Sequence, residues 1–190
     1  KDGTPFIFSE DNGPNPVVAS SGTVMKFDGS SWVLVGAEGF TNSQIAYPSI
    51  AIASDGNPYV AYQDVTHTKK ASVMLFNGSN WVNVGTTGFS TGEAQYVSLA
   101  VDADDKPYVA YRDVANSNKA TVQNFDGTSW VTYGNSIISG AVQSTNLLID
   151  SIGKISVIYS DASVKAKAVV KQFVNPDWVI LGSGGLSDGP

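Results

Sequence analysis

The sequence predicts an all-β fold, and three observations lead to that prediction. Tryptophan recurs at intervals of 49, 49 and 48 residues, each time five residues after a phenylalanine and at the start of a short apolar run that ends in glycine. Short segments rich in Val, Ile and Tyr recur upstream at the same period, and no stretch shows the period of about 3.6 that marks a helix. Four short strands per repeat are typical of β-propeller blades. The four tryptophans are Trp32, Trp81, Trp130 and Trp178.

The second repeat shows the expected strands in order. They are predicted at 49–53, 59–63, 72–76 and 81–84, because these runs are rich in β-branched and aromatic residues and are bounded by Gly, Asn, Asp and Pro. Asp55-Gly56 and Asn77-Gly78 are hairpin signals, since glycine tolerates the positive φ of a tight turn. The fourth repeat has Val-Asn-Pro-Asp at 174–177 instead, so we expect that hairpin to differ from the others.

The faces of the strands favour a propeller over other all-β folds. In the second strand, Val60 and Tyr62 point one way and Tyr59 and Ala61 the other, so both faces are mostly apolar. A blade packed between two neighbours needs this two-faced burial. The first strand contains small residues such as Ser49, which suits a crowded inner ring. A β-solenoid is the alternative, but its coils are usually shorter and lack the hairpin turns.

The period divides the chain into units at 1–47, 48–96, 97–144 and 145–190, which we expect to form a single β-propeller domain of four four-stranded blades. The second, third and fourth strands each occur in all units, but the first strand is missing from the first unit. We therefore expect the first blade to lack one strand. Such a chain is either a segment or half of a larger ring, or it obtains the missing strand from a second copy through an open blade edge.

Composition excludes several classes of function. The 190 residues include 11 basic and 17 acidic side chains, which gives a net charge of −6, and Arg112 is the single arginine. A surface that follows nucleic-acid phosphates needs clustered Lys and Arg, so we expect no nucleic-acid partner. No apolar run approaches the roughly 18 residues of a membrane span. The absence of cysteine excludes disulfides, thiolate zinc sites and cysteine nucleophiles.

Antiparallel alternation predicts where binding residues gather. The turns that join the first to the second strand and the third to the fourth lie at one mouth of the ring. The hairpins between the second and third strands, and the linkers between units, lie at the other mouth, and their greater length makes them the better candidates for function. No catalytic residue and no metal ligand is expected there. The expected ligand-binding residues are Tyr47, Asp64, Glu93, Tyr96, Arg112 and Asp113.

An aspartate recurs at the end of the second strand, as Asp64, Asp113 and Asp161, and a lysine follows each one six residues later. A ring of carboxylates could bind a cation or sugar hydroxyls. The lysine spacing favours instead a cross-strand ion pair or a turn cap worth about 0–1 kcal/mol. A second recurring position is apolar in every unit and is expected to fill the space between blades; its members are Phe40, Phe89, Ile138 and Leu186.

Catalytic and metal motifs are weak. His67 is the only histidine, it lies in a polar hairpin, and no G-x-S-x-G motif accompanies it. Zinc needs at least three ligands, and none are apparent near His67. The acidic run 102–105 hints at calcium but lacks the later glycine and glutamate of an EF-hand loop. We therefore expect no cofactor, with calcium as the open alternative.

The chain as a whole resembles the repeat-built bacterial β-propellers of secreted and surface proteins. Its segments FDGSSW, FNGSNW and FDGTSW are also similar to the Asp-box turn of sialidase-type propellers. The match departs from the family pattern, because Asp28 to Trp32 spans four positions where the Asp-box has five. In that family the motif is structural, so the resemblance implies a fold and a secreted or cell-surface location rather than an activity.

These observations favour a non-enzymatic extracellular or cell-surface module that binds a glycan or a protein through the linkers and the hairpins between second and third strands. Two alternatives stay open. One is a fragment of a propeller hydrolase or lyase that acts on polysaccharide. The other is a structural self-assembly element, a homo-oligomer that completes its ring with a second copy through the open blade edge.

Overall fold

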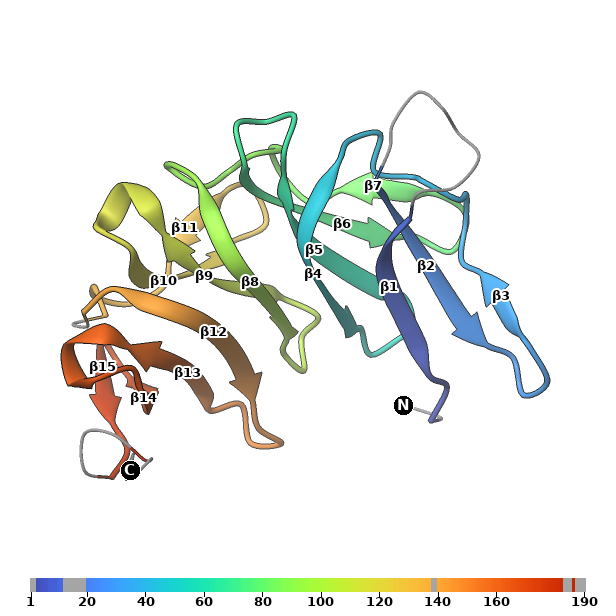
Figure 1. Ribbon diagram of the computed structural model, residues 1–190. Helices are drawn as coiled ribbons and strands as arrows, with labels where there is room; N and C mark the ends of the chain where they lie inside the picture. The colour runs from blue at the N-terminus through green and yellow to red at the C-terminus, as the bar shows by residue number, and fades with distance from the viewer. Residues whose placement is uncertain (1–2, 12–19, 138–139, 183–185, 187–190) are drawn as a thin grey trace.

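The computed structural model describes residues 3–11, 20–137, 140–182 and 186. The chain forms four antiparallel sheets that follow an arc from the N-terminus to the C-terminus (Figure 1). Blade 1 contains β1 (Phe6–Asp11), β2 (Ser21–Phe27) and β3 (Trp32–Leu34). Blade 2 contains β4 (Ile45–Ile52), β5 (Pro58–Asp64), β6 (Lys70–Phe76) and β7 (Trp81–Asn83).

The remaining two blades repeat the arrangement of blade 2. Blade 3 contains β8 (Ala94–Val101), β9 (Pro107–Asp113), β10 (Lys119–Phe125) and β11 (Trp130–Thr132), with a short 3-10 helix, η1 (Val114–Asn116), in its central hairpin. Blade 4 contains β12 (Val142–Ile149), β13 (Ile155–Asp161), η2 (Ala162–Val164), β14 (Lys167–Val174) and β15 (Asp177–Ile180). The strands of each sheet pair in chain order, and blade 1 has three strands. The prediction of an all-β propeller with one short blade is confirmed.

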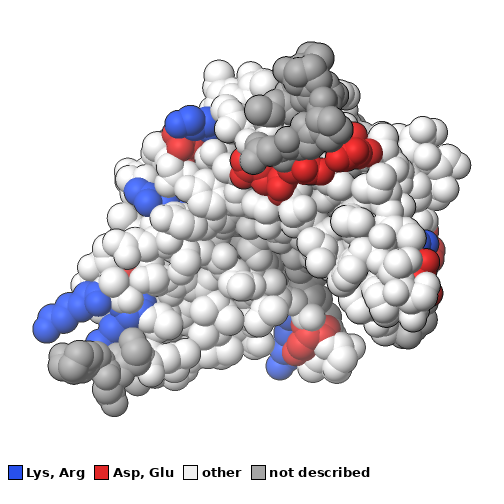
Figure 2. Space-filling view, turned by 45° about the vertical axis from the view of Figure 1, so that its right-hand side comes forward, with Lys and Arg blue, Asp and Glu red and all other residues white. Residues whose placement is uncertain are grey.

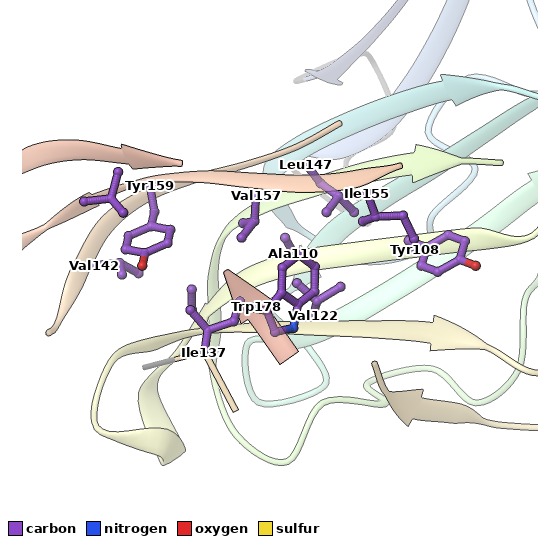
Figure 3. Close-up of a cluster of buried hydrophobic side chains, with 12 residues drawn as sticks. Tyr108, Ala110, Val122, Ile137, Val142, Leu147, Ile155, Val157, Tyr159 and Trp178 are labelled. Carbon is purple, nitrogen blue, oxygen red and sulfur yellow. The ribbon is translucent and has the colours of Figure 1, made fainter. Parts of the chain in front are cut away.

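The second strands of blades 2 and 3, β5 and β9, are buried on both faces, as the sequence predicts. All seven residues of β5 are buried. Val60 and Tyr62 pack in a cluster with Phe8 and Val24 of blade 1. Tyr59 and Ala61 pack in a second cluster with residues of blade 3. Figure 3 shows the corresponding cluster between blades 3 and 4, and its labelled residues are Tyr108, Ala110, Val122, Ile137, Val142, Leu147, Ile155, Val157, Tyr159 and Trp178.

The inner strands of neighbouring blades are joined by hydroxyl groups. The Leu99 backbone N–H donates to Ser49 Oγ at 3.0 Å, and the Leu147 N–H donates to Ser98 Oγ at 2.9 Å. These bonds explain the small residues of the first strand, because only a short side chain lets two inner strands approach this closely. The inner strands also begin four residues earlier than predicted, at Ile45 rather than at 49.

An aromatic joint links each blade to the one before it. The Trp81 Nε1–H donates to the Val35 carbonyl at 2.8 Å, and the Trp81 ring stacks on Phe40 with centroids 4.0 Å apart. The same arrangement recurs one repeat later, where Trp130 donates to Val84 at 2.8 Å and stacks on Phe89 at 4.2 Å. In blade 4, the Trp178 Nε1–H donates to the Tyr133 carbonyl at 3.2 Å.

The joint depends on a glycine directly after the carbonyl that accepts the indole N–H. A Cβ on Gly36 would lie 2.8 Å from Trp81 Nε1, and one on Gly85 would lie 2.8 Å from the Phe125 ring. Both glycines also have positive φ, at +76° and +72°. The glycines that end the first three apolar runs, Gly36, Gly85 and Gly134, are therefore required by both backbone conformation and close packing.

Within the described residues, the two ends of the arc have no neighbouring blade for this joint. Trp32 of blade 1 is 41% exposed, whereas its counterparts pack on the preceding blade. The prediction that Phe40 and Phe89 fill the space between blades is confirmed by their stacking. It is wrong for Leu186, which is 59% exposed, because no following blade packs against it among the described residues. Ile138 lies outside the described residues.

The turns between the third and fourth strands are held by one side chain each. The Asp28 carboxylate accepts the backbone N–H groups of Ser30 and Ser31, both at 2.8 Å. Asn77 and Asp126 accept the equivalent groups in blades 2 and 3. Blade 4 differs as predicted, because its turn contains a cis Asn175–Pro176 peptide and its strands pair up to Val174 and Asp177.

Among the described residues, no helix has the length and apolar character of a membrane span.

The aromatic joint can be tested at Trp130. Trp130→Phe keeps a stacking ring but removes the donor to the Val84 carbonyl, so we expect a loss of about 1 kcal/mol in the free energy of unfolding. Trp130→Ala removes the ring as well and should cost about 3–5 kcal/mol. Urea denaturation measures both values. Trp32→Ala is the matched control at the free end of the arc, and a cost equal to that of Trp130→Ala would contradict a stabilising joint.

The Asp28 turn predicts a dependence of stability on pH. Hydrogen bonds from the backbone of Ser31 and Ser30 lower the pKa of Asp28 from 3.8 to about 2. Because the folded state has the lower pKa, the carboxylate stabilises the fold above about pH 4, and this contribution is lost as the pH falls towards 2. The difference in melting temperature between the parent protein and Asp28→Asn should therefore shrink over this interval. Asn77→Asp should gain the same dependence, and parallel curves for all three proteins would refute the assignment.

Candidate functional site

The candidate site lies at one mouth of the arc, which we call the linker mouth. It is formed by the central hairpins at 65–69, 114–118 and 162–166 and by the described parts of the linkers between blades, 35–44, 84–93, 133–137 and 140–141. The end of β1, with Glu10 and Asp11, pairs with the start of β2 at the same mouth. Asp and Glu side chains gather towards the upper side of the molecule in Figure 2, the side on which this mouth lies in Figure 1, so the mouth is acidic.

Two tyrosines from neighbouring inner strands meet at this mouth. Tyr47 of β4 and Tyr96 of β8 are half-buried, and their ring centroids lie 5.0 Å apart at an interplanar angle of 49°. Each lies where its strand shifts register against the next strand, between Ala46 and Ser49 in blade 2 and between Gln95 and Ser98 in blade 3. The structure therefore brings these two predicted residues together.

The backbone at both tyrosines is unusual. Tyr47 has a φ of 51° and Tyr96 a φ of 52°, in the left-handed region that bulky side chains rarely adopt. The Tyr96 carbonyl accepts a hydrogen bond from Thr145 Oγ1 of the next inner strand, which helps to hold this conformation. Neither tyrosine hydroxyl hydrogen-bonds to another residue in the described part of the chain. Two rings are thus held in place with their polar ends free.

The three recurring aspartates are all buried, with exposures of 2% for Asp64, 5% for Asp113 and 6% for Asp161. Each is paired in register with the lysine six residues later, at Lys70, Lys119 and Lys167. The predicted ion pairs are absent from the described residues, and the carboxylates of Asp64 and Asp161 instead cap their own hairpins. The turn-cap alternative is therefore correct for two of the three.

Asp64 is fully engaged by its hairpin. Its Oδ1 accepts the Thr66 N–H at 3.1 Å, the Thr66 hydroxyl at 2.8 Å and the His67 N–H at 3.2 Å. Its Oδ2 lies 2.8 Å from His67 Nδ1 and accepts the Ser72 hydroxyl at 3.3 Å. His67 is therefore an exposed partner of a buried carboxylate.

Asp161 is capped in a similar way. Its Oδ1 accepts the Ser163 N–H at 2.8 Å, the Ser163 hydroxyl at 2.6 Å and the Gly140 N–H at 3.0 Å. A Cβ on Gly140 would lie 2.6 Å from this oxygen, so the linker can approach only as glycine. Every donor in this cap comes from the hairpin or from the linker that precedes the blade.

Asp113 is the exception. Its Oδ2 accepts the Thr121 hydroxyl at 3.2 Å, but its Oδ1 is buried and has no hydrogen-bond partner among the described residues. The residue that caps the other two aspartates, Thr66 or Ser163, is replaced here by Ala115, which has no hydroxyl. A buried acceptor without a donor is uncommon in folded proteins.

A cavity of about 270 Å³ lies beside Asp113. It is lined mainly by β9, β10, η1 and the linker that leaves blade 3, and Thr91 of the preceding linker also contributes. The Tyr111 hydroxyl donates to Gln123 Oε1 at 2.8 Å, and burial together with the nearby Asp113 charge raises the pKa of Tyr111 far above its usual range. Tyr111 is therefore a neutral hydrogen-bonding group rather than a base. The polar lining residues are Thr91, Tyr111, Asp113, Asn116, Thr121, Gln123, Thr132, Asn135 and Ser136.

Arg112 and Glu93 do not join this cavity. Arg112 Nε donates to Asn118 Oδ1 at 3.0 Å, and strand alternation places its side chain on the opposite face of β9 from Asp113. Glu93 Oε1 accepts a hydrogen bond from Gln95 Nε2 at 2.6 Å. The six predicted binding residues thus fall into a tyrosine pair, a cavity carboxylate, a structural cap at Asp64, and two residues with local partners.

The sequence interpretation missed Ala115 and most polar residues of the cavity. Aligning the residue two positions after each recurring aspartate would have shown Thr66, Ala115 and Ser163, and the missing hydroxyl is a visible departure. The run 102–105 has a structural explanation as well, since Asp102 accepts the backbone of Asp104 and Lys106, and Asp105 accepts Ser54 of blade 2. No group of three metal-ligating side chains occurs in the described ranges.

No family model and no curated protein matches the chain. Its fold is similar to that of an α-L-arabinofuranosidase from Clostridium thermocellum, with a TM-score of 0.57 and 15% identity over 98% of this chain and 70% of that chain. It is equally similar to the Aleuria aurantia lectin in complex with Fucα1-6GlcNAc, with a TM-score of 0.57 and 15% identity over 97% and 62%.

A Hadza microbial sialidase is a third similar structure, with a TM-score of 0.53 and 12% identity over 86% of this chain and 40% of that chain. The chain thus spans less than two thirds of the lectin and of the sialidase. At these identities the similarity establishes the β-propeller fold and no more.

Proposed function

We propose that this protein is a non-enzymatic carbohydrate-binding module that acts outside the cell or at its surface. The observation that carries the proposal is the tyrosine pair at the linker mouth. Tyr47 and Tyr96 present two adjoining rings, their hydroxyls have no hydrogen-bond partner within the described segments, and both have a left-handed backbone. Strained backbone at a bulky residue is typical of binding and active sites, where the surrounding structure holds it in place.

The chemistry of tyrosine suits a sugar ligand. An aromatic face packs against the apolar C–H face of a sugar ring, while the phenol hydroxyl hydrogen-bonds to a sugar hydroxyl. A pair of rings fixed by packing loses little conformational freedom on binding. The names of similar structures, which include a lectin and two glycosidases, support a ligand of this class. The low charge content, the lack of cysteine and the resemblance to secreted propellers support an extracellular location.

Binding without hydrolysis is the better interpretation of the three recurring aspartates. Most glycoside hydrolases place two carboxyl groups on opposite sides of the scissile bond. At this mouth, Asp64 and Asp161 are buried and accept hydrogen bonds from their own hairpins, so neither is free to face a substrate. Asp113 lies in a separate cavity.

A second candidate, self-assembly, is favoured by the exposed joint surface of blade 1. On this hypothesis Trp32 of one copy packs against the free face of blade 4 in another copy, where Leu181 is 42% and Ile180 is 40% exposed. Light scattering would then show an oligomer that Trp32→Ser converts to a monomer. A compact monomer at all concentrations would eliminate this candidate.

Glycan-array binding tests the proposed function. Tyr47→Ala and Tyr96→Ala should each weaken the Kd for the best glycan by roughly 10-fold, about 1.4 kcal/mol, because each removes one ring of the pair. Trp32→Ala is the matched control, since it removes an exposed ring elsewhere on the molecule, and it should bind as the parent protein does. Folded tyrosine variants that keep the full array profile would refute the proposal.

A further inference from the structure

We propose that the cavity beside Asp113 is a second binding site, which takes one hydroxyl-bearing sugar ring and places a ligand hydroxyl against Asp113 Oδ1. The proposal relies on the proposed function for the class of ligand, but the site is separate from the tyrosine pair. It is not repeated in blades 2 and 4, because there the protein supplies the hydroxyl itself.

Comparison of the three hairpins shows where the ligand hydroxyl would lie. In blade 2, Thr66 Oγ1 lies 2.8 Å from Asp64 Oδ1, and in blade 4, Ser163 Oγ lies 2.6 Å from Asp161 Oδ1. In blade 3 the equivalent side chain is the methyl group of Ala115. The position that a hydroxyl occupies in two blades therefore holds no hydroxyl of the hairpin in the third, and Asp113 Oδ1 has no partner among the described residues.

The backbone donors are absent as well. The N–H groups of Ser163 and Gly140 both bond to Asp161 Oδ1, whereas Asp113 makes no side-chain cap to its 3-10 helix. The linker glycine of blade 3, Gly92, approaches Ala115 instead, since a Cβ there would lie 2.7 Å from the Ala115 Cβ. Asp113 is 5% exposed, so little bulk water reaches the oxygen that lost its donors.

Among the buried side-chain atoms without a partner in the described residues, Asp113 Oδ1 is the one whose residue lines the cavity. Two other buried side-chain atoms lack a partner in the described part of the chain, Ser43 Oγ and Tyr159 Oη, and neither residue lines the cavity. Asp113 does line it, together with hydroxyl and amide side chains from four elements and two linkers. The site therefore combines a buried acceptor that has no partner with an adjoining polar cavity.

The size and lining of the cavity favour a single neutral ring. Its volume of about 270 Å³ is just below the range of roughly 300–1,000 Å³ typical of drug-sized ligands, so a monosaccharide fits and a longer glycan must extend outside. Thr91, Asn116, Asn135 and Ser136 offer both donors and acceptors, as a polyol requires. Calcium needs six to eight oxygen ligands, and Asp113 is the single carboxylate of the lining.

The experiment is a titration of the whole chain with methyl glycosides, namely methyl α-D-glucoside, α-D-galactoside, α-D-mannoside and α-L-fucoside. Backbone amide NMR shifts of Ala115 and Asn116 report occupancy of the cavity. We expect at least one glycoside to shift these resonances in a saturable way. Ala115→Ser supplies the missing hydroxyl and Asp113→Asn removes the carboxylate charge, and each should weaken the Kd at least 10-fold.

Ala162→Ser is the matched control, because it makes the same chemical change at an exposed position of the blade 4 hairpin, and it should leave binding unchanged. Ala115→Ser should also melt at or above the temperature of the parent protein, which separates loss of binding from unfolding. The proposal is overturned if no glycoside shifts the cavity resonances, if Ala115→Ser binds as tightly as the parent, or if calcium chloride or methylammonium chloride produces the shift in place of the sugars.

The outcome of this titration can be distinguished from the outcome of the glycan-array test of the tyrosine pair. If Ala115→Ser loses methyl glycoside binding but keeps glycan-array binding that depends on Tyr47, both proposals are supported. If the cavity resonances respond while Tyr47→Ala and Tyr96→Ala leave the array profile intact, the cavity is the sugar site and the tyrosine pair is not. If the array depends on the tyrosines but Ala115→Ser changes nothing, the cavity proposal alone is wrong.

Discussion

The structure depends on the hydrogen bond between the indole N–H of one blade and a main-chain carbonyl of the blade before it. A buried indole must find an acceptor, and the tryptophans at positions 81, 130 and 178 find theirs at Val35, Val84 and Tyr133. The acceptor lies directly before a glycine whose positive φ aims the carbonyl at the next blade. One bond thereby sets the distance and the angle between successive sheets, and the stacked phenylalanine fills the remaining space.

Because of this joint, the turns at one mouth and the central hairpins at the other differ in how far their sequences can vary. The turns between third and fourth strands lie next to the joint, and each is held by an Asp or Asn that accepts two backbone N–H groups. At the linker mouth, the linkers carry the acceptor carbonyl and the phenylalanine of the joint, but the central hairpins contribute no residue to it, so a change in one of these hairpins leaves the joint intact. Ala115 shows this freedom, because the hydroxyl is lost while β9 and β10 keep the same register as β5 and β6.

Most of the fold could be predicted from the sequence, because equivalent positions of the four repeats can be aligned with one another. Fifteen strands, the short first blade and the two-faced burial of β5 all follow from patterns that recur at a constant period. The start of the inner strands could not be predicted, since the register shift at Tyr47 and Tyr96 places bulky residues in the left-handed region, against their local preference. Leu186 was predicted to be buried because its counterparts are, but burial there needs a neighbouring blade, which residue type does not reveal.

The candidate site was less predictable for a related reason. Regularity shows which residues the scaffold needs, so the recurring aspartates were correctly suspected of capping turns, and Asp64 and Asp161 do so. A binding residue in a repeat protein is more visible as a departure from the repeat. Asp113 has the same residue type and position as Asp64 and Asp161. It differs from them because Ala115 stands where Thr66 and Ser163 provide a hydroxyl donor. At Asp113 the hairpin offers no hydroxyl, so one carboxylate oxygen has no partner among the described residues, and the blade keeps both its register and its joint. If Asp113 binds a ligand as proposed, the residues around the carboxylate distinguish this site from the equivalent positions in blades 2 and 4, because the aspartate itself is the same in all three.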